Sequence, residues 1–238
     1  MQKNYLADNL EKPKDTIYRY ETKFFIQNMD RNFIENMISH HPAFFSEIYH
    51  SRHINNIYFD NLNLSSFHDN IDGNTDRIKY RIRWYGKIFG DIEKAKLELK
   101  IKKGLVGTKR TFDINAFKFN TGFDLSEIKT SMLNSYLDSR ILFALQDKLP
   151  VMLNRYKRTY FETNDKKFRI TIDDCQEFYR LNNYKNSFLQ KYKDSSNVIV
   201  EVKYDIRHKN KINQITNRLP FRVTKSSKYS RGIQLLYY

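Results

Sequence analysis

Charged and apolar residues alternate along several short segments of this sequence, and this period of two constrains the fold more than any other feature. Residues 78–84 read IKYRIRW, and residues 96–102 read KLELKIK. Because successive side chains of a β-strand point to opposite faces, each segment predicts a strand with one charged and one apolar face.

The alternation predicts nine short strands, a number that favours a barrel. The predicted strands span residues 17–25, 54–59, 78–84, 95–102, 109–114, 153–161, 168–172, 178–181 and 198–204. Helices are expected between Asp30 and Pro42 and at residues 125–133, 135–148, 209–219 and 229–236. The expected fold is therefore mainly β (α+β), with a polar N-terminal tail at residues 1–16 and one domain at residues 17–238.

The chain is strongly basic, with 42 Lys and Arg against 27 Asp and Glu and a formal net charge of +15, so an anionic partner is expected. When charges are sorted by strand face, eleven cations share faces with only four carboxylates. The cations are Arg19, Lys23, Lys79, Arg81, Arg83, Lys96, Lys100, Lys102, Arg158, Arg169 and Lys203. The carboxylates are Glu21, Glu98, Asp173 and Glu201.

Two architectures satisfy this sorting. An open antiparallel sheet with helices on its apolar side would leave the charged face in water. A sheet that closes would direct the charges into a lumen, where like charges repel until a polyanion neutralises them. The carboxylates could simply pair with the cations, or they could hold Mg²⁺ or Mn²⁺, which prefer oxygen ligands together with phosphates and water.

Six short segments resemble the VTC domain in order and spacing. They read YRYETK (18–23), IYFD (57–60), KYRIRWYG (79–86), LELK (97–100), VEVKY (200–204) and SKYS (227–230). The VTC domain is the polyphosphate polymerase module of the triphosphate tunnel metalloenzyme, or CYTH, superfamily. The resemblance covers the chain from about Tyr18 to its end.

The resemblance implies an eight-stranded antiparallel tunnel, open at both ends, with helices packed on its outside. The implied phosphate-binding residues are Lys23, Arg81, Arg83, Lys100, Arg158, Arg169, Lys225, Ser227 and Lys228. Arg81, Arg83, Lys100 and Glu201 would be the catalytic residues. Glu201 would also bind the metal, Mn or Mg, with Glu21 and Glu98 as further candidate ligands.

The implied reaction moves the γ-phosphoryl group of ATP onto inorganic polyphosphate and releases ADP. A tunnel-type triphosphatase and a non-catalytic polyphosphate-binding module remain the alternatives. Hydrolytic members of the superfamily begin with an ExExK strand, and here Arg19 stands at the first Glu position. This departure favours the polymerase branch.

Other functions find less support in the sequence. Nucleic-acid binding through stacking is the main non-enzymatic rival, but Trp84 lies on the face opposite the cations. His40, His41, His50 and His53 are not accompanied by a Cys or a cluster of acids at metal-ligand spacing. No segment is long and apolar enough to suggest a transmembrane helix, and the single Cys175 favours a reducing cytoplasm.

Overall fold

The computed structural model describes residues 19–104, 106–122, 124–182 and 186–238. Strands dominate the chain, and short helices lie between them. In chain order the strands are β1 (Arg19–Ile26), β2 (Phe45–Asp60), β3 (Arg77–Tyr85), β4 (Gly90–Ile92), β5 (Lys96–Lys103), β6 (Val106–Asp113), β7 (Phe117–Phe119), β8 (Leu149–Thr163), β9 (Phe168–Arg180), β10 (Lys191–Asp194) and β11 (Val198–Asp205). The helices are α2 (Arg31–Ser39), α3 (Ser65–Ile71), α4 (Leu125–Leu133), α5 (Ser139–Leu145), the 3₁₀ helix η1 (Ile206–Lys211), α6 (Ile212–Thr216) and α7 (Lys228–Tyr237).

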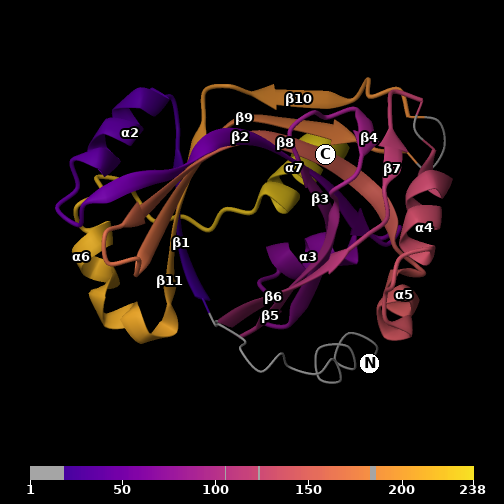
Figure 1. Cartoon of the computed structure of the whole chain (residues 1–238), viewed down its shortest axis with the longest axis horizontal. Coiled ribbons are helices and arrows are strands. Elements are labelled where there is room, and N and C mark those ends of the chain that lie inside the picture. Colours follow the sequence, from indigo (N-terminus) through magenta and orange to yellow (C-terminus); the bar gives the residue numbers. More distant parts are fainter. Residues whose placement is uncertain (1–18, 105, 123, 183–185) are drawn as a thin grey trace.

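Nine strands form one antiparallel sheet in the order β10-β9-β11-β1-β6-β5-β3-β2-β8, and β8 pairs back with β9. Eight of the strands therefore follow one another round a ring, while β10 lies beside β9 (Figure 1). The ring is not fully closed, because among the described residues only Arg19 and Gly107 pair across the seam between β1 and β6. The mainly β, tunnel-like fold expected from the sequence is confirmed.

The main apolar core lies outside the ring, because the apolar faces of β1, β3, β5 and β11 point outward. On one side, Trp84, Leu97 and Leu99 pack with residues of α4, α5, β4 and β7. On the other side, Phe24, Ile170 and other apolar residues of β1, β9 and β11 pack with α2 and α6. Figure 1 shows these two groups of helices on opposite sides of the ring.

One end of the ring has an apolar interior that accommodates α7. Tyr58 of β2, Met152 of β8 and Phe178 of β9 form a buried cluster with residues of this helix. Gly232 allows the close approach, since a Cβ there would lie 2.1 Å from Met152 Sδ and 2.6 Å from Phe178 Cδ1. The resemblance implies a tunnel open at both ends, whereas here the C-terminal helix packs inside one end.

Several elements differ from the sequence-based expectation. β2 has 16 residues and β9 has 13, because bulges let each strand continue past a break in its alternation. At the bulge in β9, Cys175 adopts a φ of 47°. The helix expected at 135–148 is limited to α5, since the Asp138 carboxylate caps its start by accepting from the Arg140 amide. The segment 209–219 divides between η1 and α6.

Elements β4, β7, β10 and α3 were not predicted, since they are too short to show a clear period. The predicted tail at residues 1–16 lies outside the described residues. Across the described part of the chain, the structure contains no helix with the length and apolar character needed to cross a membrane.

We predict that Gly232→Ala destabilises the fold. In a solvated helix this change would be favourable by about 1 kcal/mol, but here the new methyl group overlaps Met152 and Phe178. Urea unfolding should show a loss of about 1–3 kcal/mol. Gly122→Ala is the control, because the nearest atom to its Cβ, Asn120 Oδ1, is 3.6 Å away. Equal stability of Gly232→Ala and the wild type would contradict the close packing of α7.

Candidate active site

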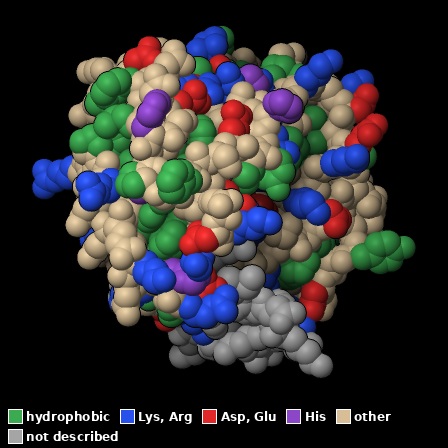
Figure 2. Space-filling model, turned by 60° about the vertical axis from the view of Figure 1, so that its left-hand side comes forward, with side chains coloured by type: hydrophobic (Ala, Val, Ile, Leu, Met, Phe, Trp, Pro, Cys, Tyr) green, Lys and Arg blue, Asp and Glu red, His purple; other side chains and the backbone are tan. Residues whose placement is uncertain are grey.

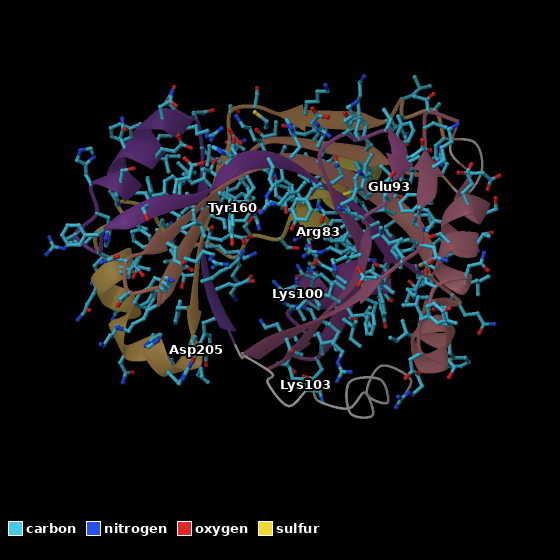
Figure 3. All side chains as sticks on the ribbon, in the orientation of Figure 1. Arg83, Glu93, Lys100, Lys103, Tyr160 and Asp205 are labelled. Atoms are coloured by element: carbon cyan, nitrogen blue, oxygen red, sulfur yellow. The ribbon has the colours of Figure 1, made fainter. Side chains whose placement is uncertain are left out.

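The inner face of the ring carries a network of paired charges that links several strands and α7. Nine cations and four carboxylates there contact one another or the first turn of α7. The cations are Lys23, Lys79, Arg81, Arg83, Lys100, Lys109, Arg158, Lys203 and Lys228, and the carboxylates are Glu21, Glu98, Asp173 and Glu201. Figure 3 shows Arg83 and Lys100 on the inner side of the ring. On the outer surface in Figure 2, by contrast, basic, acidic and apolar side chains are interspersed.

Asp173 and Glu201 form the most buried part of this charge network. The Arg158 guanidinium donates to both Asp173 oxygens and lies 3.5 Å from Glu201 Oε2. The Lys228 ammonium also contacts both carboxylates, with 3.5 Å to Glu201 Oε1. Two cations thus connect the two carboxylates, whose residues are 0% and 5% exposed.

Strand register accounts for most of this geometry. Arg158 of β8 lies directly opposite Asp173 of β9, and Lys23 of β1 lies directly opposite Glu201 of β11. Lys23 Nζ is 2.9 Å from Glu201 Oε1, and Lys203 Nζ is 2.9 Å from Oε2. Cross-strand neighbours on one face are close enough to pair, so the sequence alternation places these groups together.

The N-terminus of α7 supplies Lys228, the cation that contacts both Asp173 and Glu201 from outside the strands. Ser227 is the N-cap, and its Oγ accepts from the Ser230 amide. Lys228 is the first residue of the helix, is 9% exposed and lies with Nζ 4.8 Å from the centre of the Tyr156 ring. The same Ser227 Oγ accepts a 2.9 Å hydrogen bond from Lys79 Nζ, which connects β3 to α7.

The other two carboxylates are held by separate sets of cations. Glu98 accepts from Arg81 Nε at 2.7 Å and from Lys109 Nζ at 2.8 Å. Glu21 accepts from Lys100 Nζ at 2.9 Å and lies 3.5 Å from Lys23 Nζ. Lys23 therefore links Glu21 to the Glu201 cluster, whereas Glu98 belongs to a different part of the inner face.

The carboxylates of the inner face are stabilised in their ionised form. Burial raises the pKa of Glu201, but the neighbouring Lys203, Lys23 and Lys228 outweigh it and hold that pKa well below its usual range. The pKa of Asp173 is lowered in the same way by Arg158 and Lys228 against the effect of burial. The pKa values of Glu21 and Glu98 are also lowered, against burial, by Lys100 and Arg81 above all. Such groups are weak bases at neutral pH.

Two lysines of this face have lowered pKa values. Burial lowers the pKa of Lys203 to about 8, although Glu201 opposes the shift. Burial and the nearby Arg77 and Lys100 hold the pKa of Lys79 well below its usual range. Lys79 hydrogen-bonds to Asn70 Oδ1 and Ser227 Oγ, and within the described residues it has no carboxylate at ion-pair distance.

The structure brings seven of the nine expected phosphate-binding residues together in the charge network of the inner face and the start of α7. They are Lys23, Arg81, Arg83, Lys100, Arg158, Ser227 and Lys228. Arg169 lies on the same face, opposite Lys203 of β11, but it pairs with Glu162 at 2.6 Å and its side chain is 40% exposed. Lys225 is exposed, and the described residues offer it no hydrogen bond or ion pair. Ser227, expected as a donor, accepts hydrogen bonds here.

Asp173, Lys79 and Lys203 were not assigned a role from the sequence, although the sorting by face included all three. Asp173 was missed because its importance depends on a partner from another strand, Arg158, and on Lys228 from the last helix. The strand register would have been the signal, since it places Asp173 opposite Arg158. Lys79 could have been found from its position two residues before Arg81 on the same face.

The donor set suits a hard cation that arrives with phosphate. The described residues contain no cluster of three His, Cys, Asp or Glu side chains that could bind a metal by themselves. Mg²⁺ usually takes only one or two carboxylates and completes its coordination with phosphates and water. Glu201 and Asp173 meet this requirement in number and position, because their shared contacts with Arg158 and Lys228 place the two carboxylates close together. Glu98 fits less well, since its contacts are with a different set of cations.

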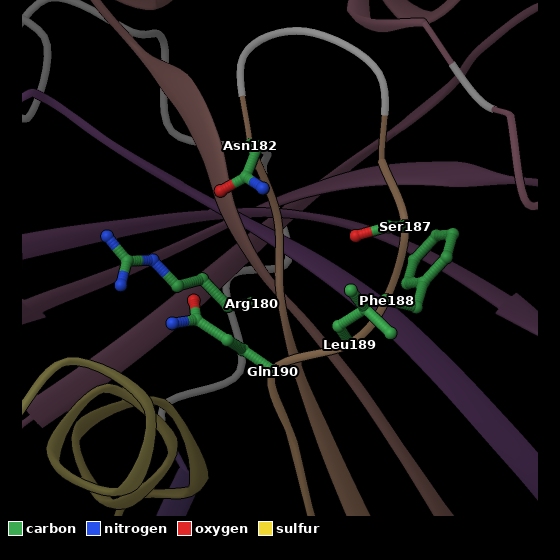
Figure 4. Close-up of a pocket in the computed structure, with 6 residues that line it drawn as sticks. All are labelled: Arg180, Asn182, Ser187, Phe188, Leu189 and Gln190. Carbon is green, nitrogen blue, oxygen red and sulfur yellow. The ribbon is translucent and has the colours of Figure 1, made fainter.

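A surface pocket of about 420 Å³ lies apart from this network (Figure 4). Its lining residues are Arg180, Asn182, Ser187, Phe188, Leu189 and Gln190, from the end of β9 and the segment before β10. None of them belongs to the nine cations and four carboxylates of the inner face. The pocket is therefore separate from the candidate active site.

Solved structures share this arrangement of strands. The fold is similar to that of a candidate adenylate cyclase from Vibrio parahaemolyticus, with 8% identity, a TM-score of 0.52, and 92% of this chain and 99% of that chain covered. A protein from Pyrococcus horikoshii is similar with 11% identity, a TM-score of 0.50, and 90% and 99% of the two chains covered. At these identities the similarity establishes the fold alone. A comparison with curated proteins finds no match.

The ring of antiparallel strands and its basic, acid-paired inner face define a tunnel-type protein with an interior suited to anions. The sequence matches the family model of the VTC domain over residues 18–237. The chain belongs to the VTC domain family, as the six segments of the sequence indicated.

We predict that Asp173→Asn strongly destabilises the fold, because Arg158 and Lys228 would remain buried without their carboxylate. Removing one partner of a buried ion pair costs about 3–5 kcal/mol, which urea unfolding can measure. Asp113→Asn is the control, since that side chain is 85% exposed and its ion pair is with Lys96, whose side chain is 51% exposed. A loss no larger than the control's would show that Asp173 does not hold this cluster together.

We also predict that polyanion affinity falls as the pH rises through about 8. Below that pH the Lys203 ammonium is charged and attracts the anion, and above it the neutral amine does not. Calorimetry with inorganic tripolyphosphate should show several-fold weaker binding at pH 9 than at pH 7.5. In Lys203→Arg this loss should become smaller, because a guanidinium stays charged over this range. Lys96→Arg, with a side chain 51% exposed, is the control. An equal loss in Lys203→Arg and the wild type would refute the assignment.

Proposed function

We propose that this chain transfers the γ-phosphoryl group of ATP to the end of an inorganic polyphosphate, within the ring and with Mn²⁺ or Mg²⁺. The proposal rests on one observation above all. Among the described residues, the charge network of the inner face combines nine cations with only four carboxylates, and its central pair, Asp173 and Glu201, shares Arg158 and Lys228. Membership of the VTC domain family supports the same reaction.

A polyanion would relieve the excess positive charge of this face. Cations at short spacing repel one another, and charge-assisted hydrogen bonds to phosphate oxygens offset that repulsion. Arg81 and Arg83 lie two residues apart on the same face, so their guanidinium groups could bind neighbouring phosphoryl groups of one chain. Lys23, Lys100 and Lys203 would neutralise further oxygens from β1, β5 and β11.

Phosphoryl transfer requires alignment and charge neutralisation more than covalent chemistry by the protein. Glu201 and Asp173 would hold the divalent cation, and the bound cation would supply further neutralisation of the transferred group. Arg158 and Lys228 would stay beside the carboxylates and would use their remaining N–H groups to contact phosphate oxygens. Arg81, Arg83 and Lys100 would orient the donor triphosphate.

The ionisation of the inner carboxylates favours a phosphate acceptor over water. Activation of water needs a base whose pKa is near the working pH, but the pKa values of Glu21, Glu98, Asp173 and Glu201 are all lowered. The terminal phosphate of a polyphosphate is already anionic and needs no base. This argument favours the polymerase over the triphosphatase, which uses the same site with water as the acceptor.

The test is incubation of the purified chain with ATP and Mn²⁺ or Mg²⁺, with ADP, inorganic phosphate and long-chain polyphosphate measured together. ADP with polyphosphate would support the polymerase. Inorganic phosphate without polymer would indicate the triphosphatase, and polyphosphate binding without turnover would indicate a binding module. An absence of both turnover and polyanion binding would refute the proposal.

We predict that Glu201→Gln lowers turnover at least about 100-fold, because the metal loses its main carboxylate ligand. Polyphosphate binding should persist, since this change removes a negative charge from the binding face. Arg81→Ala should instead weaken both binding and turnover. Glu93→Gln is the matched control, because Glu93 is exposed and lies away from the centre of the ring (Figure 3). Unchanged turnover in Glu201→Gln would contradict the metal assignment.

A further inference from the structure

Three tyrosines surround one arginine at an exposed position of the ring. The Arg52 guanidinium carbon lies 4.8 Å from the centre of the Tyr85 ring, 5.1 Å from that of Tyr160 and 5.2 Å from that of Tyr49. Tyr49 and Tyr160 also contact each other edge to face, with 5.6 Å between ring centres. We call these four residues the tyrosine cluster. None of them was singled out from the sequence.

The tyrosine cluster and α7 lie at opposite ends of the inner face. Along β3 the inward positions run from Lys79, which contacts α7, through Arg81 and Arg83 to Tyr85. Along β8 they run from Met152, which packs against α7, to Tyr160 (labelled in Figure 3). The charged part of the inner face lies between these two ends.

The cluster is continuous with the candidate active site. Tyr85 is two residues beyond Arg83 on the same face, a separation of about 7 Å along a strand. Tyr160 contacts both Arg52 and Arg158, with 5.9 Å between the Arg158 guanidinium carbon and the ring centre. A ligand whose phosphates reach Arg83 and Arg158 would therefore have its other end beside the tyrosine cluster.

The position of α7 determines which end of a nucleotide reaches the cluster. Because α7 packs inside one end of the ring, against β8 and β9, and narrows that end, a nucleoside triphosphate would approach from the other end with its γ-phosphate first. Its nucleoside would then remain at the end that carries Tyr49, Tyr85 and Arg52. This step rests on the proposed function, in which ATP is the phosphoryl donor.

We propose that the tyrosine cluster is a stacking subsite for the nucleobase of the donor nucleotide. Tyr85 is 48% exposed and Tyr49 is 51% exposed, so part of each side chain is accessible to a ligand. Aromatic rings and guanidinium groups both stack on nucleobases, and such stacking depends little on which base is present. The subsite would therefore distinguish a nucleotide from inorganic polyphosphate and would discriminate only weakly between ATP and GTP.

The experiment compares ATP with inorganic tripolyphosphate by calorimetry on the full chain, since only ATP carries a base. Tyr85→Ala should weaken ATP binding at least about fivefold and leave tripolyphosphate binding unchanged. Tyr85→Phe should bind ATP like the wild type, because stacking requires the ring and not the hydroxyl group. Tyr136→Ala, at a fully exposed tyrosine in the segment before α5, is the control for a general effect of losing a ring.

Two results would overturn the subsite: Tyr85→Ala binds ATP as tightly as the wild type, or it loses affinity for ATP and tripolyphosphate equally. The second result would mean that the tyrosine cluster only supports the fold around the active site. Arg81→Ala separates this failure from failure of the proposed function, because it should weaken both ligands. If the wild type binds neither ligand, the proposed function and the subsite are both wrong.

Discussion

The rest of the inner face depends on a buried carboxylate, Asp173, that is held between two cations. A carboxylate with no exposed surface is very costly unless it is paired and hydrogen-bonded, so Arg158 and Lys228 must stay beside it. Arg158 connects Asp173 to the neighbouring strand, and Lys228 connects it to the first turn of α7. One charge thus links the register of β8 and β9 to the position of the C-terminal helix.

This polar interior explains why the apolar cores lie outside the ring. When the inward positions of β1, β3, β5 and β11 are charged, their alternate residues must be covered from the outside, and α2, α4, α5 and α6 cover them. At the α7 end, by contrast, the inward positions are Tyr58, Met152 and Phe178, and a helix packs inside. Along β8 and β9 the inner face therefore changes from charged, at Arg158 and Asp173, to apolar, at Met152 and Phe178.

The sequence predicts the strands and the inner cations well, because both depend on a period of two that is local to each strand. It predicts the ends of β2 and β9 poorly, since bulges such as the one at Cys175 shift the alternation by one residue. The position of α7 depends on contacts between Gly232 and two distant strands, which no local pattern reveals. Asp173 and the tyrosine cluster were missed for the same reason. The contacts of Asp173 with Arg158 and Lys228, and those of Arg52 with Tyr85 and Tyr160, join residues more than ten positions apart in the sequence.

The four inner carboxylates also bear on how a tunnel could release its product. A face of cations alone would bind a polyanion very tightly, and product release limits the turnover of many enzymes. Here Lys23, Lys100 and Arg81 each have a carboxylate partner that can replace a departing phosphate oxygen. When a polyphosphate moves, each cation exchanges one anionic partner for another, and this exchange lowers the net change in electrostatic energy. Under the proposed function, the four carboxylates would thus let the polyphosphate move past the inner face while the cations remain paired.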